Sequence, residues 1–178
     1  FTAAFDAAVK RMYPDGPTSQ DYSSIINEHH YQRLLALRDE AREQGARIIE
    51  TGVAARPDVE RDRIIAPTLV LGVREDMRIM REEVFGPLLP VRSVQHVEEA
   101  IDIINAGPRP LALYYFGPND AERKAVLART TSGNVTINNT LLHYAQDDLP
   151  FGGVGSSGMG AYHGVEGFRA MSHARGVL

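Results

Sequence analysis

The chain has 178 residues and a formal net charge of -4, so it offers no strong electrostatic case for binding nucleic acid or an anionic membrane. Hydrophobic residues make up 43%, which allows a globular core, and the complete lack of cysteine excludes disulfides, thiolate metal sites and a cysteine nucleophile within these residues. No apolar run approaches the roughly 20 residues of a membrane helix and no basic-then-apolar leader opens the chain, so we expect a cytoplasmic protein without a membrane segment.

Two helices are predicted in the first third of the chain. Apolar residues recur at helical spacing over 1–12, and two prolines and a glycine within 13–17 end that helix. A second helix is predicted over 27–44, with Gly45 just beyond its C-terminus. The side chains expected on its shared face are Tyr31, Leu34, Leu35 and Arg38.

Strands and helices alternate through the rest of the chain, apart from a polar surface loop predicted at 53–62. This alternation predicts an α/β fold with a mainly parallel sheet flanked by helices. Pro67 suggests an edge position or an irregular start for the strand that contains it. The predicted strands are 47–50, 64–71, 88–94, 111–116, 134–138 and a last one at 172–178. The predicted helices after the first two are 96–106, 121–129 and a short one at 162–170.

A glycine-rich stretch contains six glycines within residues 152–164. Residues 153–158 match G-x-G-x-x-G, the pattern of a dinucleotide pyrophosphate loop. A loop rather than a strand precedes the match, only 20 residues follow it, and no carboxylate lies at the spacing needed to hold a ribose. We therefore favour a glycine-rich turn in which backbone segments approach closely.

Other chemical patterns are weak. Met159 takes the place of the last glycine of the G-x-S-x-G motif of hydrolases, so the sequence does not support a hydrolase with a serine nucleophile here. The six histidines include no H-E-x-x-H pair, and the adjacent His29 and His30 point to different helix faces, so we expect no metal site. Arg109 lies between two prolines and is interpreted as a solvated loop residue.

The segment at 81–87, Arg-Glu-Glu-Val-Phe-Gly-Pro, is the best candidate for a binding site. If it is extended, Glu83 and Phe85 project from the same side. A carboxylate can accept hydrogen bonds from two neighbouring hydroxyls, as in a ribose, and an aromatic ring can pack against a flat heterocycle. Taken alone, the pattern favours simpler roles, a solvated acid at Glu83 and a core phenylalanine at Phe85.

Four ordered motifs resemble the aldehyde dehydrogenase superfamily. Glu82–Pro87 is similar to its E-E-[IV]-F-G-P segment, and Pro150–Gly153 is similar to its later P-F-G-G loop. Pro110–Tyr114 and Ser132–Asn138 match the strands between these motifs. The ending of the glycine-rich stretch, over 152–164, is similar to the class-3 and coniferyl aldehyde dehydrogenase branch.

The resemblance implies oxidation of an aldehyde to a carboxylic acid with NAD or NADP, through a cysteine thiolate and a thioester. It implies that Glu83 binds the nicotinamide ribose hydroxyls, that Phe85 lies near the nicotinamide, and that Phe151 lies close to the substrate tunnel. His143 and Tyr144 match the loop that shapes the substrate entrance more loosely. It also implies a homo-oligomer, a dimer being expected, and no metal.

The resemblance has a large gap, because the family's nucleophilic cysteine, general-base glutamate and nucleotide-binding domain lie before the matched region. Residues 1–171 therefore resemble the C-terminal part of the catalytic domain, and 172–178 the start of the C-terminal oligomerisation strand. The isolated chain is expected to be inactive. The alternative is a non-catalytic assembly module that retains the fold and offers an edge strand to another chain.

Overall fold

The computed structural model describes residues 1–52 and 63–178, so the loop predicted at 53–62 lies outside the described residues. The chain divides into two compact units, residues 1–93 and 94–178, and each is described by itself. The α/β fold class predicted from the sequence is confirmed. Two of the three paired strand neighbours are parallel, although the strands are divided between two small sheets.

The first unit is built on a three-stranded sheet with the order β1-β2-β3. β2 runs antiparallel to β1 and parallel to β3. Of the two roles predicted for Pro67, the edge position is wrong, because β2 is the central strand. The irregular start is confirmed, because residues 64–67 have no regular structure and Pro67 lies immediately before β2. The Pro67 carbonyl accepts hydrogen bonds from the backbone nitrogen and the hydroxyl of Thr51, at 2.9 and 2.6 Å. The strands are β1 (Arg47–Glu50), β2 (Thr68–Leu71) and β3 (Leu88–Val91).

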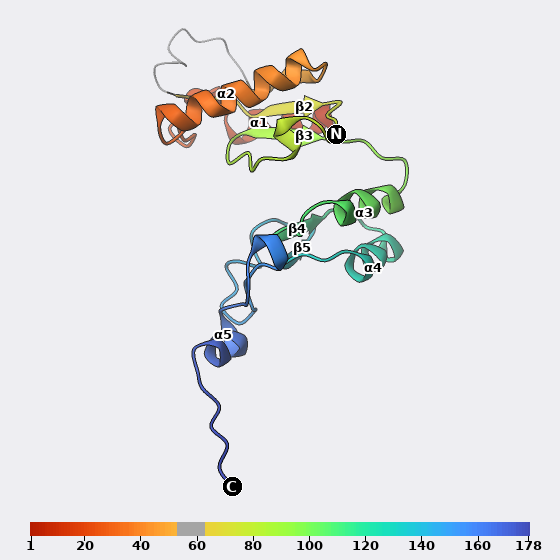
Figure 1. Cartoon of the computed structure of the whole chain (residues 1–178). Coiled ribbons are helices and arrows are strands. Elements are labelled where there is room, and N and C mark those ends of the chain that lie inside the picture. The colour runs from red at the N-terminus through yellow and green to blue at the C-terminus, as the bar shows by residue number, and fades with distance from the viewer. Residues whose placement is uncertain (53–62) are drawn as a thin grey trace. The chain divides into compact units, whose positions relative to one another are not determined.

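Helix α2 packs its apolar face on this sheet (Figure 1). Its N-terminus is capped by Asn27, whose side-chain oxygen accepts a hydrogen bond from the backbone nitrogen of His30 at 2.9 Å. Gly45 follows the helix with a φ of +96°, a conformation that favours glycine. The helical elements of this unit are α1 (Thr2–Met12), α2 (Glu28–Glu43) and two 3-10 turns, Gly16–Thr18 and Arg78–Met80.

The buried face of α2 differs in part from the prediction. Leu37, which the prediction omitted, is fully buried, whereas Arg38 is turned toward Asp39 and Glu50. Leu35 is partly buried and packs at the margin of the core. The residues of α2 that are buried are Tyr31, Leu34, Leu37 and Ala41. They form one core with residues of the sheet and of the turn before β3, including Val70, Met77, Ile79 and Leu88.

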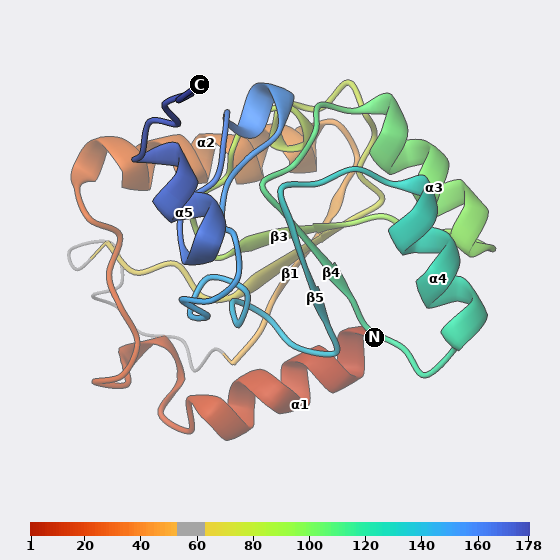
Figure 2. The same ribbon diagram turned by 90° about the horizontal axis from the view of Figure 1, so that it is seen from below.

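The second unit contains a parallel pair of strands covered by two helices. Figure 2 shows α3 and α4 side by side along β4 and β5. Ile101 of α3, Leu113 of β4 and Val126 of α4 are the buried centre of this core. Asn119 caps α4 by accepting hydrogen bonds from two backbone nitrogens. The elements are α3 (Val97–Ala106), β4 (Ala112–Tyr115), α4 (Asp120–Arg129) and β5 (Asn134–Ile137).

The C-terminal part of this unit is mostly irregular. It contains a 3-10 turn at Gly155–Ser157 and the helix α5 at Gly164–Ala170. The strand expected at 172–178 is absent from the described chain, and pairing of these residues with a second chain stays a prediction. None of the described helices has the length and apolar character to cross a membrane.

Candidate functional site

Glu83 lies in the irregular segment between the 3-10 turn at Arg78–Met80 and β3. Its side chain is exposed and makes no hydrogen bond or ion pair with residues 1–52 or 63–178. The adjacent Glu82 behaves differently, because Arg78 Nε lies 2.8 Å from its Oε1. This hydrogen bond from Arg78 holds the pKa of Glu82 below its ordinary value. Of the two neighbouring carboxylates, only Glu83 is therefore left open to a ligand.

Phe85 is also open, with 85% of its surface exposed. The alternative role in the core is therefore wrong for this residue. Its φ is +47°, in the left-handed region, whereas the sequence argument assumed an extended segment. Side-chain alternation does not apply across such a residue, so a common direction for Glu83 and Phe85 stays a prediction.

Helix α2 contacts residues 83–86 through two neighbouring side chains, those of Arg33 and Leu34. Arg33 donates from Nη1 to the carbonyl of Glu83 at 3.1 Å and from Nη2 to the carbonyl of Val84 at 2.5 Å. Gly86 lies against Leu34, and a Cβ built on the glycine would come within 2.6 Å of the Cδ1 of this leucine. One turn of α2 therefore fixes the backbone on both sides of Phe85.

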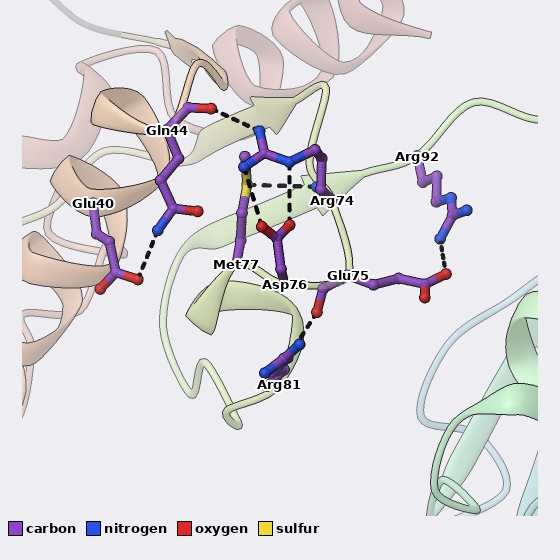
Figure 3. A network of polar contacts seen from close by, with 8 residues as sticks. All are labelled: Glu40, Gln44, Arg74, Glu75, Asp76, Met77, Arg81 and Arg92. Atoms are coloured by element: carbon purple, nitrogen blue, oxygen red, sulfur yellow. Dashed lines mark hydrogen bonds and ion pairs between the residues drawn. The ribbon is translucent and has the colours of Figure 1, made fainter.

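The turn that precedes the segment is tied to the C-terminus of α2 by Arg74 (Figure 3). Arg74 donates to the Gln44 carbonyl at 2.7 Å and to both carboxylate oxygens of Asp76. Arg81 and Arg92 hold Glu75 in the same way, through its carbonyl and its carboxylate respectively. These contacts join residues 74–81 to the helix and to the end of β3, and so limit the movement of the chain that enters the site.

The second unit brings His143 and Phe151 together, as two of the residues proposed for the substrate. Their rings are stacked with centroids 5.9 Å apart and an angle of 13° between the planes. His143 is only 7% exposed, and its Nδ1 lies 2.6 Å from Thr136 Oγ1. The structure thus places His143 behind Phe151, hydrogen-bonded to β5, and not on the open surface of the loop.

Phe151 is the centre of a larger aromatic cluster. Tyr144 and Tyr162 meet its ring edge to face, with centroids 5.3 and 5.5 Å away. The backbones of Phe151 and Tyr162 exchange two hydrogen bonds of 2.8 and 2.9 Å. Beside the cluster is an open hollow of about 430 Å³, which includes Leu111, Phe151, Met159 and Tyr162 in its lining.

His163 belongs to the same cluster, although sequence reasoning did not select it. Its ring lies 4.4 Å from that of Tyr162, and its φ is +71°. Its Nδ1 is buried and has no hydrogen-bond partner in the part of the chain that the structure describes. Only its place directly after Ala161-Tyr162 in the glycine-rich stretch could have drawn attention to it.

The interpretation of residues 153–158 as a close-approach turn is confirmed. A Cβ on Gly153 would collide with the Ser157 carbonyl, and one on Gly152 with the Gly160 carbonyl. The segment forms a single 3-10 turn, in which Val154 N donates to Ser157 Oγ at 2.9 Å. Arg109 is not simply solvated, because its Nη1 contacts Asn105 and its carbonyl accepts from Ser156 Oγ at 3.5 Å.

Comparison with known proteins agrees with these features. The model of the aldehyde dehydrogenase family matches residues 1–177. The chain is 48% identical to a probable coniferyl aldehyde dehydrogenase of Caulobacter vibrioides and 46% identical to the coniferyl aldehyde dehydrogenase of a Pseudomonas strain. Both alignments include 100% of this chain and 37% of the relative. It is 43% identical, over 96% of its length and 36% of the relative's, to the dimeric NADP-preferring aldehyde dehydrogenase of Canis lupus familiaris.

Solved structures give the same result. The substrate-bound AldH of Staphylococcus aureus has a TM-score of 0.85 and 39% identity, covering 97% of this chain and 36% of that one. A betaine aldehyde dehydrogenase of the same organism, in complex with NAD+, has a TM-score of 0.75 and 27% identity, covering 92% and 34%. The chain thus spans about a third of each of these five relatives.

Proposed function

This chain belongs to the aldehyde dehydrogenase family, and we propose that it contributes the nicotinamide-ribose contact and part of the substrate wall to an NAD(P)-dependent enzyme that oxidises an aromatic aldehyde of the coniferaldehyde type. The chain contains no cysteine, so the nucleophile must come from a part of the whole protein outside these residues. The 178 residues alone are expected to be inactive.

The observation that carries the proposal is the open carboxylate of Glu83, two residues before the exposed ring of Phe85. A carboxylate without a protein partner can accept hydrogen bonds from both hydroxyls of a ribose. An exposed aromatic ring can cover one face of a nicotinamide. The residues present therefore fit NAD or NADP, and the dinucleotide supplies a hydride acceptor when it is bound.

The substrate class is proposed from the second unit. Phe151 is surrounded by aromatic rings and lines an open hollow. A flat aromatic aldehyde gains dispersion and edge-to-face contacts against such rings. His143 stacks on the Phe151 ring and is itself hydrogen-bonded to Thr136, so its proposed role is to shape the wall. The names of the coniferyl aldehyde dehydrogenase relatives agree with this substrate class.

The proposed assembly is a homodimer, by analogy with the dimeric relative and with 172–178 as the pairing strand. Light scattering of the whole protein tests it. The cytoplasmic location expected from the sequence stays a prediction.

The test compares Glu83→Gln with Glu82→Gln in the whole protein. Fluorescence titration with NADH measures the dissociation constant, and coniferaldehyde oxidation measures turnover. Glu83→Gln should weaken dinucleotide binding about tenfold, since it removes a charged hydrogen-bond acceptor. Glu82→Gln should leave it within about twofold, because that carboxylate is paired with Arg78. Equal, unchanged affinity in both variants would overturn the role of Glu83, and NADH production by the 178 residues alone would overturn the need for an external nucleophile.

A further inference from the structure

Arg33 reaches from α2 to the main chain of the segment that carries Glu83. Its two terminal nitrogens donate to two successive carbonyls, those of Glu83 and Val84. We propose that Arg33 is a positioning residue for the dinucleotide: it holds the peptide groups on the C-terminal side of Glu83 so that the carboxylate is set in place before a ligand arrives. This inference rests on the proposed function of Glu83.

Arg33 differs from the other two arginines of α2, and from Arg78, in what it binds. Arg38, Arg42 and Arg78 each pair with a carboxylate. Arg33 makes no ion pair with any residue that the structure describes, and its side chain donates hydrogen bonds to backbone oxygens. The hydrogen bonds of the guanidinium thus fix backbone geometry, and its charge adds to that of Arg78 in lowering the pKa of Glu82.

The chemistry of the side chain suits this task. A planar guanidinium presents several donors in a fixed arrangement and can bind two acceptors at once. A lysine ammonium has no such fixed fork, so Arg33→Lys keeps the charge but loses part of the double contact. Leu34 adds a second constraint, because its buried side chain leaves room only for a glycine at 86.

The functional consequence follows from the cost of ordering a binding loop. A ligand that must order a flexible segment binds more weakly than one that meets a segment already fixed. The contacts of Arg33 shift that cost from binding to folding, and they act on Glu83 without touching the ligand.

The test is a double-mutant cycle in the whole protein with Arg33→Met, Glu83→Gln and the two combined, measured by NADH titration. Arg33→Met should weaken NADH binding about fivefold in the parent and less than about twofold when Glu83 is already Gln, because residues that act as one unit are not additive. Arg33→Lys should recover part of the loss. The Michaelis constant for the aldehyde should not change, which separates positioning of Glu83 from general loss of structure.

Arg38→Met is the matched control, since Arg38 lies on the same helix and, among the described residues, forms ion pairs only with Asp39 and Glu50. It should leave NADH affinity unchanged. If Arg33→Met fails to fold, Arg33→Lys replaces it in the double-mutant cycle with Glu83→Gln. Unchanged affinity in the Arg33 variants, or equal effects with and without Glu83, would overturn the inference while leaving the proposed function intact. No effect of Glu83→Gln itself would overturn the proposed function instead.

Discussion

Gly86 and Leu34 are packed so closely that the glycine has no room for a side chain. A Cβ at residue 86 would lie 2.6 and 2.7 Å from the two methyl carbons of Leu34. Leu34 itself is 0% exposed and sits in the main core of its unit, so it has little freedom to move aside. The place where the Glu83 segment meets α2 is therefore fixed by sterics as well as by the hydrogen bonds of Arg33.

Gly86→Ala tests this packing. The added methyl must displace a buried leucine, and overpacking of this kind costs about 1–3 kcal/mol. We expect a lower urea midpoint together with weaker NADH binding in the whole protein. Gly107→Ala is the control, because a Cβ there would meet nothing closer than a backbone oxygen at 3.7 Å and the φ of -89° suits alanine. If Gly86→Ala is as stable as the control, the contact is looser than described.

Thr136→Val tests the buried support of His143. The valine keeps the shape of threonine but leaves His143 Nδ1 without the partner that now lies 2.6 Å away. An unsatisfied buried polar group costs about 1–3 kcal/mol, so the free energy of unfolding should fall by that amount. Thr136→Ser, which retains the hydroxyl, should restore most of it. Equal stability of the valine and serine variants would show that this hydrogen bond contributes little.

Tyr22→Phe tests a pH dependence. Burial raises the pKa of Tyr22 from 10.0 to about 12, and its hydroxyl donates to the Ile65 carbonyl at 2.6 Å. The folded chain thus holds this proton more tightly than the unfolded chain does. The resulting stability is complete below the unfolded pKa of 10.0 and is lost as the pH rises toward about 12. Unfolding measured at pH 8 to 12 should show a steeper alkaline loss in the parent than in Tyr22→Phe, and parallel curves would contradict this assignment.

Gly153→Ala tests the close-approach turn. The new Cβ would overlap the Ser157 carbonyl, which belongs to the backbone and has no rotamer to adopt. The variant should misfold locally or lose more than about 3 kcal/mol of stability. Gly155→Ala, which meets only the Arg109 side chain at 3.9 Å but has a φ of +62°, should cost about 1 kcal/mol. Protein yield and thermal unfolding separate the two outcomes.

The limits of α2 were predictable because both of its ends carry local signals. The Asn27 cap and Gly45 mark the limits of α2 to within one residue of the prediction. Strand lengths were less predictable: the strands predicted at 64–71 and 88–94 are longer than the hydrogen-bonded parts at Thr68–Leu71 and Leu88–Val91. An apolar run shows burial, but not where ladder pairing ends, and the order of strands in a sheet depends on contacts that no single run contains.

The site was predictable only in its residue types. The resemblance selected Glu83, Phe85, Phe151 and His143, but it could not show that Glu82 is paired or that His143 is buried behind Phe151. The left-handed backbone of Phe85 was also hidden, because phenylalanine has no preference for that region. Arg33 left no local signal, since its acceptors lie 50 and 51 residues away.

The separation of 50 and 51 residues between Arg33 and its two acceptors has a consequence for the order of folding. Contacts between distant parts of a chain require a long loop to close first, and they form after local helices. The Arg33 guanidinium can therefore form its hydrogen bonds to the Glu83 and Val84 carbonyls only once α2 and the segment that carries Glu83 have come together. In a nascent or partly collapsed chain, the segment that carries Glu83 is not yet held by Arg33. The gain of affinity for the nicotinamide dinucleotide during refolding should therefore mark the last step in the folding of this unit and not the first.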